Sequence, residues 1–285
     1  MAAARYIDYD PATGKFTVSP EQATVLLDTR SPYDMGGAFL YSQASIRQVP
    51  ALMEAFRNGG GVPFGDFGPE IVEAIEGLFQ AGYETAVAAA WIPAVPGLHE
   101  RLSNGATVAE VGCGAGQCLV PVAKAYPNSR FVGFDIDGPS LERARKKASA
   151  AGVAGCATFE AVPAEELPAD ARFDLVMAFN CIHDMSDPRG ALRGVRGALA
   201  EDGVFLWSEA NASDQLEDNL TPMGRTLYGA STMHCMTVSL ADGGEGLGTV
   251  VGPDQARALG EEAGFTRFER LPVEHPYHQV FVLQR

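Results

Sequence analysis

Residues 106–137 read ATVAEVGCGAGQCLVPVAKAYPNSRFVGFDID, and this stretch decides the fold. An apolar run over 107–111 leads into a turn with three glycines, and a helical stretch then precedes a second apolar run over 131–134. Glycine lets the backbone of such a turn approach a ligand closely, with a helix N-terminus behind it. Asp135 follows the second run, where a carboxylate can accept hydrogen bonds from ribose hydroxyls. The stretch therefore predicts a strand–turn–helix–strand unit that binds an adenosine-containing ligand.

The chain from about residue 97 onward alternates strand-like and helix-like segments, which is typical of a parallel sheet with right-handed crossovers. The predicted strands cover 107–111, 131–134, 157–161, 173–179 and 204–209, and the predicted helices cover 117–126, 140–151 and 188–199. Two further strand-like runs are joined by a short connection, so they must pair as an antiparallel hairpin, 266–271 with 279–283. We expect an α/β fold with a doubly wound, mostly parallel seven-strand sheet that closes with this C-terminal hairpin.

Residues 1–96 follow a different pattern and predict a small, mostly helical N-terminal region. Two short alternating runs around Pro-Ala-Thr-Gly predict a β-hairpin, and Ser19 followed by Pro20 predicts a helix start. From residue 31 to 100 the apolar spacing is mostly helical, with breaks at 59–61 and at two prolines. We expect 1–96 to act as a cap and dimerisation region, giving a homodimer, in front of a ligand-binding domain over 97–285.

The segment 210–250 interrupts the alternation of strands and helices because it is long, polar and rich in glycine. Insertions of this length in a compact domain are usually functional lids or loops. It contains three residues with reactive side chains, Tyr228, His234 and Cys235. We expect this insertion to be a lid that helps to enclose a bound small molecule.

Composition limits the classes of protein to consider. The 285 residues are 46% hydrophobic and 20% charged, near the averages for globular proteins. No apolar run is long enough to cross a membrane, and MAAARYIDYD at the start lacks a signal-peptide core, so we expect no membrane partner and a cytoplasmic location. The net charge of -15 would repel phosphate backbones, which argues against nucleic acid as a partner. Five scattered cysteines do not predict a disulfide framework, and no second cysteine or histidine pair completes four ligands, so we predict no metal.

The glycine turn and its surroundings resemble the seven-strand S-adenosylmethionine-dependent methyltransferases. Glu110 precedes the turn, and the third glycine is not displaced as it is in the G-x-G-x-x-G dinucleotide fingerprint. FDLVMAFNCIHDMSDP at 173–188 resembles the segment that this family places at the carboxyl end of its fourth strand. AFRNGGGVPF at 55–64 and STMHCMTVSL at 231–240 are similar to a bacterial subgroup with an N-terminal winged-helix-like region, which is shortened here.

This resemblance implies S-adenosylmethionine as the cofactor and assigns roles to individual residues. The three glycines would face the methionine part and the ribose, Glu110 would help to anchor the amino group, and Asp135 would hold the ribose. Pro163 stands where the family commonly has an acid, so the backbone amide of Ala164 would serve the adenine instead. The full set of predicted cofactor-binding residues is Glu110, Gly112, Gly114, Gly116, Asp135, Ile136, Ala164 and Asn180.

Methyl transfer from an activated donor depends mainly on orientation, which can contribute about 7–11 kcal/mol, so a general base is optional. His183 is the first candidate base, since it follows the fourth strand and histidine titrates near pH 6.5. Tyr228 and His234 are further catalytic candidates. The alternatives are that His183 is a structural histidine and that Tyr228 and His234 are ordinary loop residues. We predict transfer to a small-molecule acceptor whose oxygen, carbon, nitrogen or sulfur is methylated. A non-catalytic S-adenosylmethionine-binding regulator and a nicotinamide-dependent oxidoreductase remain alternative functions.

Overall fold

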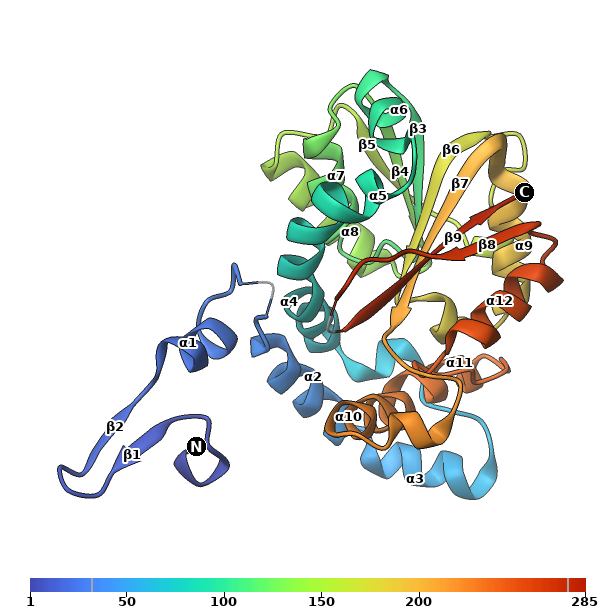
Figure 1. Ribbon diagram of the computed structural model, residues 1–285. Coiled ribbons are helices and arrows are strands. Elements are labelled where there is room, and N and C mark those ends of the chain that lie inside the picture. Colours follow the sequence, from blue (N-terminus) through green and yellow to red (C-terminus); the bar gives the residue numbers. More distant parts are fainter. Residues whose placement is uncertain (32, 276) are drawn as a thin grey trace.

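The computed structural model describes residues 1–31, 33–275 and 277–285, and a seven-stranded sheet forms its centre (Figure 1). The strands lie in the order β5-β4-β3-β6-β7-β9-β8. The first five in this order are parallel, whereas β9 is antiparallel to both β7 and β8, which confirms the predicted C-terminal hairpin. The strands are β3 (Thr107–Val111), β4 (Arg130–Asp135), β5 (Ala157–Ala161), β6 (Phe173–Phe179), β7 (Leu199–Ala210), β8 (Arg267–Arg270) and β9 (His278–Gln284).

Helices cover both faces of the sheet, and each face has its own apolar core. On one face, Leu119 and Leu141 of the crossover helices pack with Trp91 and the inward side chains of β3. On the other face, Leu192 and Leu259 pack against Trp207. The sheet is therefore buried on both sides, as a parallel sheet requires. The covering helices are α6 (Leu98–Asn104), α7 (Leu119–Ala125), α8 (Gly138–Ala150), α9 (Pro188–Ala198) and α12 (Pro253–Glu262).

The N-terminal region begins with the predicted hairpin and continues as helices. Ser19 accepts a hydrogen bond from the Gln22 N–H, and the Gln22 side chain accepts one from the Ser19 N–H, which fixes the predicted helix start. Figure 1 shows the hairpin and α1 extending away from the sheet. The elements are β1 (Asp8–Asp10), β2 (Lys15–Thr17), α1 (Pro20–Leu26), α2 (Gly36–Arg47), α3 (Val49–Asn58), α4 (Pro69–Ala86), a π-helical turn at 87–91 and α5 (Ile92–Ala94).

The segment 210–250 interrupts the strand–helix alternation, and the structure folds much of it into helices that the sequence analysis did not predict. These are α10 (Pro222–Ala230), a π-helical turn at Ser231–Cys235 and α11 (Met236–Ala241). Several buried positions in this segment are polar, among them Ser231, Thr237 and Ser239, so it lacks the apolar stripe that reveals a helix in a sequence.

Segment 210–250 and the N-terminal region are in direct contact at Gly61. The Val62 N–H donates hydrogen bonds to the carbonyl and the hydroxyl of Thr237, at 3.1 and 2.9 Å. A Cβ atom at Gly61 would lie 1.9 Å from the Thr237 carbonyl oxygen, so only glycine fits at this approach. Figure 1 shows α2, α3, α10 and α11 gathered below the carboxyl ends of the strands.

Among the described residues, no helix combines the length and the apolar character needed to cross a bilayer.

Candidate active site

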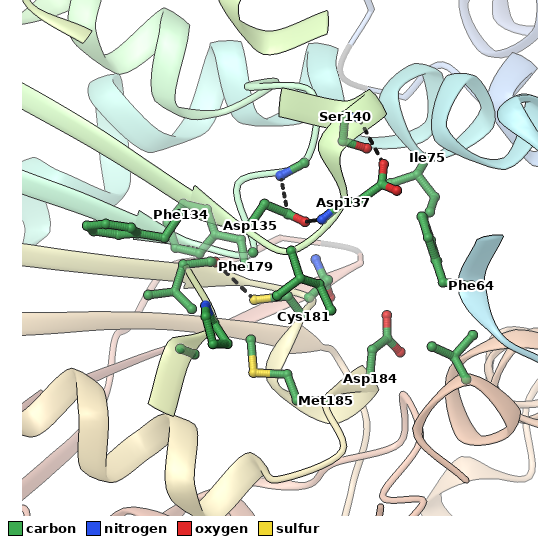
Figure 2. A pocket seen from close by; sticks show the side chains of 18 of the residues that line it. Phe64, Ile75, Phe134, Asp135, Asp137, Ser140, Phe179, Cys181, Asp184 and Met185 are labelled. Atoms are coloured by element: carbon green, nitrogen blue, oxygen red, sulfur yellow. Dashed lines mark hydrogen bonds between the residues drawn. The ribbon is translucent and has the colours of Figure 1, made fainter. Parts of the chain in front are cut away.

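A cavity of about 250 Å³ lies at the carboxyl ends of β3, β4 and β6 (Figure 2). The chain order reverses between β3 and β6, and open α/β sheets bind their ligands at such a switch point. The N-terminal region and α11 supply the opposite wall. The lining includes three groups of residues: Gly112, Gly114, Gln117, Asp135, Ile136, Asp137, Pro163, Ala164 and Glu165 from the first half of the sheet; Asn180, Cys181, Asp184, Met185 and Asp187 after β6; and Phe64, Val72, Ile75, Phe79, Val238 and Asp242 on the opposite wall.

The glycine turn approaches the segment after β6 too closely for a side chain. Gly112 has a φ of 62°, and a Cβ atom there would lie 2.6 Å from the Cys181 Cβ. Gly112 and Gly114 both line the cavity. Gly116 does not belong to the described lining; a Cβ atom there would meet Val120 and Ala144 at 3.2–3.3 Å, so this glycine lets the turn pack on its helices.

Asp135 connects the glycine turn to the end of β4. One carboxylate oxygen accepts a hydrogen bond from the Gly114 N–H at 2.8 Å, and the other accepts one from the Asp137 N–H at 2.9 Å. Burial raises the pKa of Asp135, while these two N–H groups oppose the rise. Each oxygen keeps a second lone pair, so the carboxylate can still accept from ribose hydroxyls. Ile136 is 74% exposed and lines the cavity, so its side chain is available to an adenine ring.

Asn180 has a left-handed backbone conformation, with a φ of 51°, at the end of β6. Its amide nitrogen donates to the Tyr83 hydroxyl at 2.7 Å and lies 3.1 Å from the His278 Nδ1. Burial lowers the pKa of His278 to about 3, so this ring is neutral and its Nδ1 can accept a hydrogen bond. Both amide hydrogens of Asn180 are thus directed away from the cavity that the residue lines, which leaves its carbonyl oxygen as an acceptor for a ligand.

Glu110 lies behind the glycine turn and is 3% exposed. Its Oε2 has no hydrogen-bond partner among the described residues, and burial raises its pKa to about 8. Gln117 Oε1, on the cavity wall, is also buried without a partner in the described part of the chain. A buried acceptor without a partner is unfavourable by about 1–3 kcal/mol, so both atoms suit a ligand that brings hydrogen-bond donors.

His183 follows β6 and is held by two carboxylates. Its Nδ1 binds Glu209 Oε2, and its Nε2 lies 3.2 Å from Asp184 Oδ1. The Trp207 indole N–H donates to the other oxygen of Glu209 at 2.7 Å. Burial alone would lower the pKa of His183, but the charges of Glu209 and Asp184 raise it well above its ordinary value.

This ion pair makes the stability of the fold depend on pH. The pKa of His183 is higher in the folded chain than in the unfolded one, where it is about 6.5. The stabilisation is therefore fully present below pH of about 6.5 and is lost as pH rises through the folded-state pKa.

The structure brings His234 and Cys235 close to His183, while Tyr228 lies apart from them. His234 is 2% exposed and packs against the rings of Tyr41 and Phe67, with ring centroids 5.4 and 4.8 Å away. Burial lowers the pKa of His234. Tyr228 is 38% exposed, its hydroxyl accepts from the Asn219 amide at 3.4 Å, and it is absent from the described cavity lining. The prediction that Tyr228 is catalytic therefore rests only on its place in segment 210–250.

Several residues of the site were missed by the sequence analysis. Glu209 is the most important, because it fixes the orientation of His183. The only signal in the sequence is an acidic residue in the apolar strand VFLWSEA, a position that only a paired carboxylate can occupy when buried. No pattern in the sequence marked Gln117 as part of the site. The apolar residues of α4 on the opposite wall were also not predicted, because apolar residues at helical spacing most often pack in a core.

Comparison with known families agrees with this geometry. A family model described as "Methyltransferase domain" matches residues 102–263, more than half of the chain. The chain belongs to this methyltransferase family. The matched region contains the glycine turn, Asp135 and the segment with His183, so it covers most of the site.

Solved structures share the fold of this methyltransferase over its whole length. A putative O-methyltransferase from Nostoc punctiforme superposes with a TM-score of 0.72 at 19% identity, covering 100% of this chain and 81% of that one. Mitomycin 7-O-methyltransferase MmcR gives a TM-score of 0.70 at 19% identity, covering 100% and 81%. Human N-acetylserotonin methyltransferase, solved in complex with S-adenosylmethionine (SAM), gives 0.64 at 20% identity, covering 100% and 80%. These structures establish a class I methyltransferase fold.

A curated relative matches a shorter part of this methyltransferase. The polyketide synthase ThaQ from Burkholderia thailandensis is 26% identical over 107 residues, which are 38% of this chain and 5% of that synthase. The chain thus matches a small part of the synthase.

Replacing Asp184 by Asn should lower the pKa of His183, because one of the two carboxylates that favour its protonated form is removed. The measurement is an NMR titration of the His183 imidazole in both proteins. In the unmodified chain this ring should stay protonated well above pH 6.5. The control is Asp187→Asn, which makes an equal charge change at an exposed residue that caps α9. This variant should leave the pKa of His183 unchanged. Identical titrations in all three proteins would contradict this account of His183.

Proposed function

We propose that this methyltransferase transfers the methyl group of SAM to a small-molecule acceptor, with His183 as the general base. The single observation that supports this proposal most strongly is the arrangement of the cavity. Asp135, which the Gly114 N–H contacts in the proposed cofactor cradle, lies at one side, and Asp184 lies at the other (Figure 2). Asp184 is the neighbour of His183. SAM, when bound, supplies a methyl group activated by a positively charged sulfur.

The cofactor fits this cavity in three respects. Gly112 allows a ligand to approach the backbone, and Asp135 has free lone pairs for a ribose. The unpaired Oε2 of Glu110 and the carbonyl of Asn180 suit the ammonium group of the methionine part, directly or through water. Ile136 and Ala164 line the side expected for the adenine. We assign the ribose to Asp135, and the adenine to Ile136 and the backbone of Ala164.

The acceptor is proposed to lie between Asp184 and the opposite wall. That wall is apolar and includes Phe64, Ile75 and Val238, two residues from the N-terminal region and one from segment 210–250. The charged residues in the described lining are all acidic: Asp135, Asp137, Glu165, Asp184, Asp187 and Asp242. We therefore propose that 1–96 and 210–250 enclose a neutral or cationic acceptor with an apolar body, in front of a domain over 97–285.

The proton of an acceptor hydroxyl would pass to His183. Nδ1 of His183 is occupied by Glu209, whereas Nε2 lies on the side of Asp184, which lines the cavity. Nε2 is therefore the nitrogen proposed to accept the proton. His183 must be neutral to accept a proton, and the two carboxylates favour its protonated form. Turnover should therefore rise with pH until His183 is deprotonated.

Asp135→Ala should weaken SAM binding by a factor of about 10 or more, because the ribose hydroxyls lose their charged acceptor. Isothermal titration calorimetry with SAM and with its demethylated product measures this effect. Asp242→Ala removes the same charge from the α11 side of the cavity and is the matched control, which should bind both ligands nearly as the unmodified chain does. Unchanged affinity in Asp135→Ala would refute the ribose assignment. Binding of NADH in place of SAM would favour an oxidoreductase.

His183→Gln should reduce kcat by about 100-fold or more while cofactor affinity stays nearly intact, since base catalysis typically contributes 10²–10⁴-fold. The acceptor is first found by screening neutral, cationic and anionic metabolites with isotope-labelled SAM. The variant should also lose the rise of kcat with pH, a change that a purely structural role would not produce. Full activity of His183→Gln would remove His183 as the base, and binding of SAM without any methylated product would favour a regulator.

We also propose a homodimer formed through the N-terminal region. Helix α3 has no buried residue in the described chain, and its side chains Met53 and Phe56 are 49% and 67% exposed, as is Ile46 of α2 at 62%. An apolar face of this kind is typical of an interface. A second copy is the occupant proposed, in keeping with the dimer expected from the sequence.

Small-angle scattering should give a mass of about 60 kDa, twice the 30.2 kDa of one chain. The double change Met53→Ser and Phe56→Ser should lower it toward the mass of one chain, because the interface loses apolar area. Leu216→Ser, an equally exposed apolar residue outside α2 and α3, is the control. A monomer mass for the unmodified chain would contradict the dimer.

A further inference from the structure

Three potential metal ligands from distant parts of the chain meet beside the cavity. His183, Asp184 and Cys235 each place one ligand atom within 4.8 Å of the other two. His183 and Cys235 are buried, and Asp184 is partly exposed. Ligands around a tetrahedral Zn²⁺ at ordinary bond lengths lie about 3.3–3.8 Å apart, so small side-chain movements would close this cluster on an ion. No spacing pattern in the sequence indicates this cluster, because Cys235 is separated from the other two by about 50 residues.

The surroundings of His183 match those of a histidine that binds a metal. Glu209 holds Nδ1, and the Trp207 indole N–H in turn holds Glu209. In protein metal sites the ligating histidine almost always gives its other ring nitrogen to a carboxylate or carbonyl, which fixes the ring and increases its basicity. Nε2 is therefore the nitrogen available to a metal, and it lies 3.2 Å from Asp184 Oδ1.

Two polar atoms near this cluster are buried without hydrogen-bond partners. Asp184 Oδ1 has none among the described residues, so its approach to His183 is an ionic contact and not a well-aligned hydrogen bond. His234 Nε2 likewise has none within the described chain, in a side chain that is 2% exposed. Such atoms are costly when left unpaired. A divalent cation at the cluster would give Asp184 a partner and offset two of the three negative charges of Asp184, Glu209 and a Cys235 thiolate.

We propose that His183, Asp184 and Cys235 form a Zn²⁺-binding site. The mixed nitrogen, oxygen and sulfur ligands favour zinc over magnesium or calcium, which prefer oxygen alone. Asp184 lines the cavity, as Figure 2 shows, so the proposed site adjoins the proposed acceptor space. A site with three protein ligands and one open position can bind water or an acceptor atom.

Zinc bound at this site would also affect methyl transfer, an inference that rests on the proposed function. The metal would occupy Nε2, the nitrogen that receives the acceptor proton. Bound zinc should therefore inhibit methyl transfer, and a chelator should restore it. Zinc binding itself is independent of this step and can be measured without an acceptor.

Zinc and cobalt titrations of the chelator-treated protein test the site. Calorimetry should show one equivalent of Zn²⁺ bound with micromolar affinity or tighter, and Co²⁺ should give a thiolate-to-cobalt charge-transfer absorption. Cys235→Ala should weaken zinc binding at least about tenfold and abolish that absorption, and Glu209→Gln should weaken binding by about 10–100-fold. Cys156→Ala is the matched control, because Cys156 is half-buried before β5 and should not affect binding.

Circular dichroism establishes that each variant is folded. Should Cys235→Ala fail to fold, Asp184→Ala takes its place, since this side chain is partly exposed and its loss should also weaken binding at least tenfold. Equal zinc affinity in the Cys235 and Cys156 variants would overturn the proposal. So would the absence of zinc binding by the unmodified chain at about 100 µM. Neither result would bear on cofactor binding or on the role of Asp135.

Discussion

The buried ion pair between His183 and Glu209 is the interaction on which the segment after β6 in this methyltransferase depends. Glu209 is fully buried in a central strand, where an unpaired carboxylate would be strongly unfavourable. His183 and the Trp207 indole together occupy its two oxygens. Removing one partner of such a pair commonly destabilises a protein by about 3–5 kcal/mol, because the remaining charge stays buried. The pair fixes the turn after β6, and this turn carries Asp184 into the cavity and Cys181 against Gly112.

The sequence was sufficient to predict the sheet and to bring together several residues that line the cavity. The strands at 107–111, 157–161 and 173–179 match the structure residue for residue, because each has continuous or alternating apolar residues bounded by turn residues. Gly112, Gly114 and Asp135 lie within 25 residues of one another, so their proximity follows from a single crossover unit. Ala164 and Asn180 also line the cavity, because the carboxyl ends of parallel strands meet at one edge.

The remaining parts of the site depend on contacts between distant segments, which no local pattern reveals. Glu209 meets His183 from a neighbouring strand, and Tyr41 approaches Cys235 across 194 positions of the chain. The helices within 210–250 were missed because buried serine and threonine side chains replace the usual apolar stripe. They are stabilised by packing and hydrogen bonds with the N-terminal region, and tertiary packing of this kind often outweighs local helix propensity.

The close approach of Gly61 to Thr237 also bears on the shape of the cavity. The backbones of the N-terminal region and α11 are in contact there, and the Val62 N–H donates to two acceptors of Thr237, so an outward movement of either segment alone would break both hydrogen bonds. The two segments of the wall opposite the sheet are therefore joined, and separating them would leave the Val62 N–H without either acceptor, which is unfavourable where the group is buried. A side chain larger than glycine at position 61 would push the two backbones apart and so change the shape of the cavity from outside its lining.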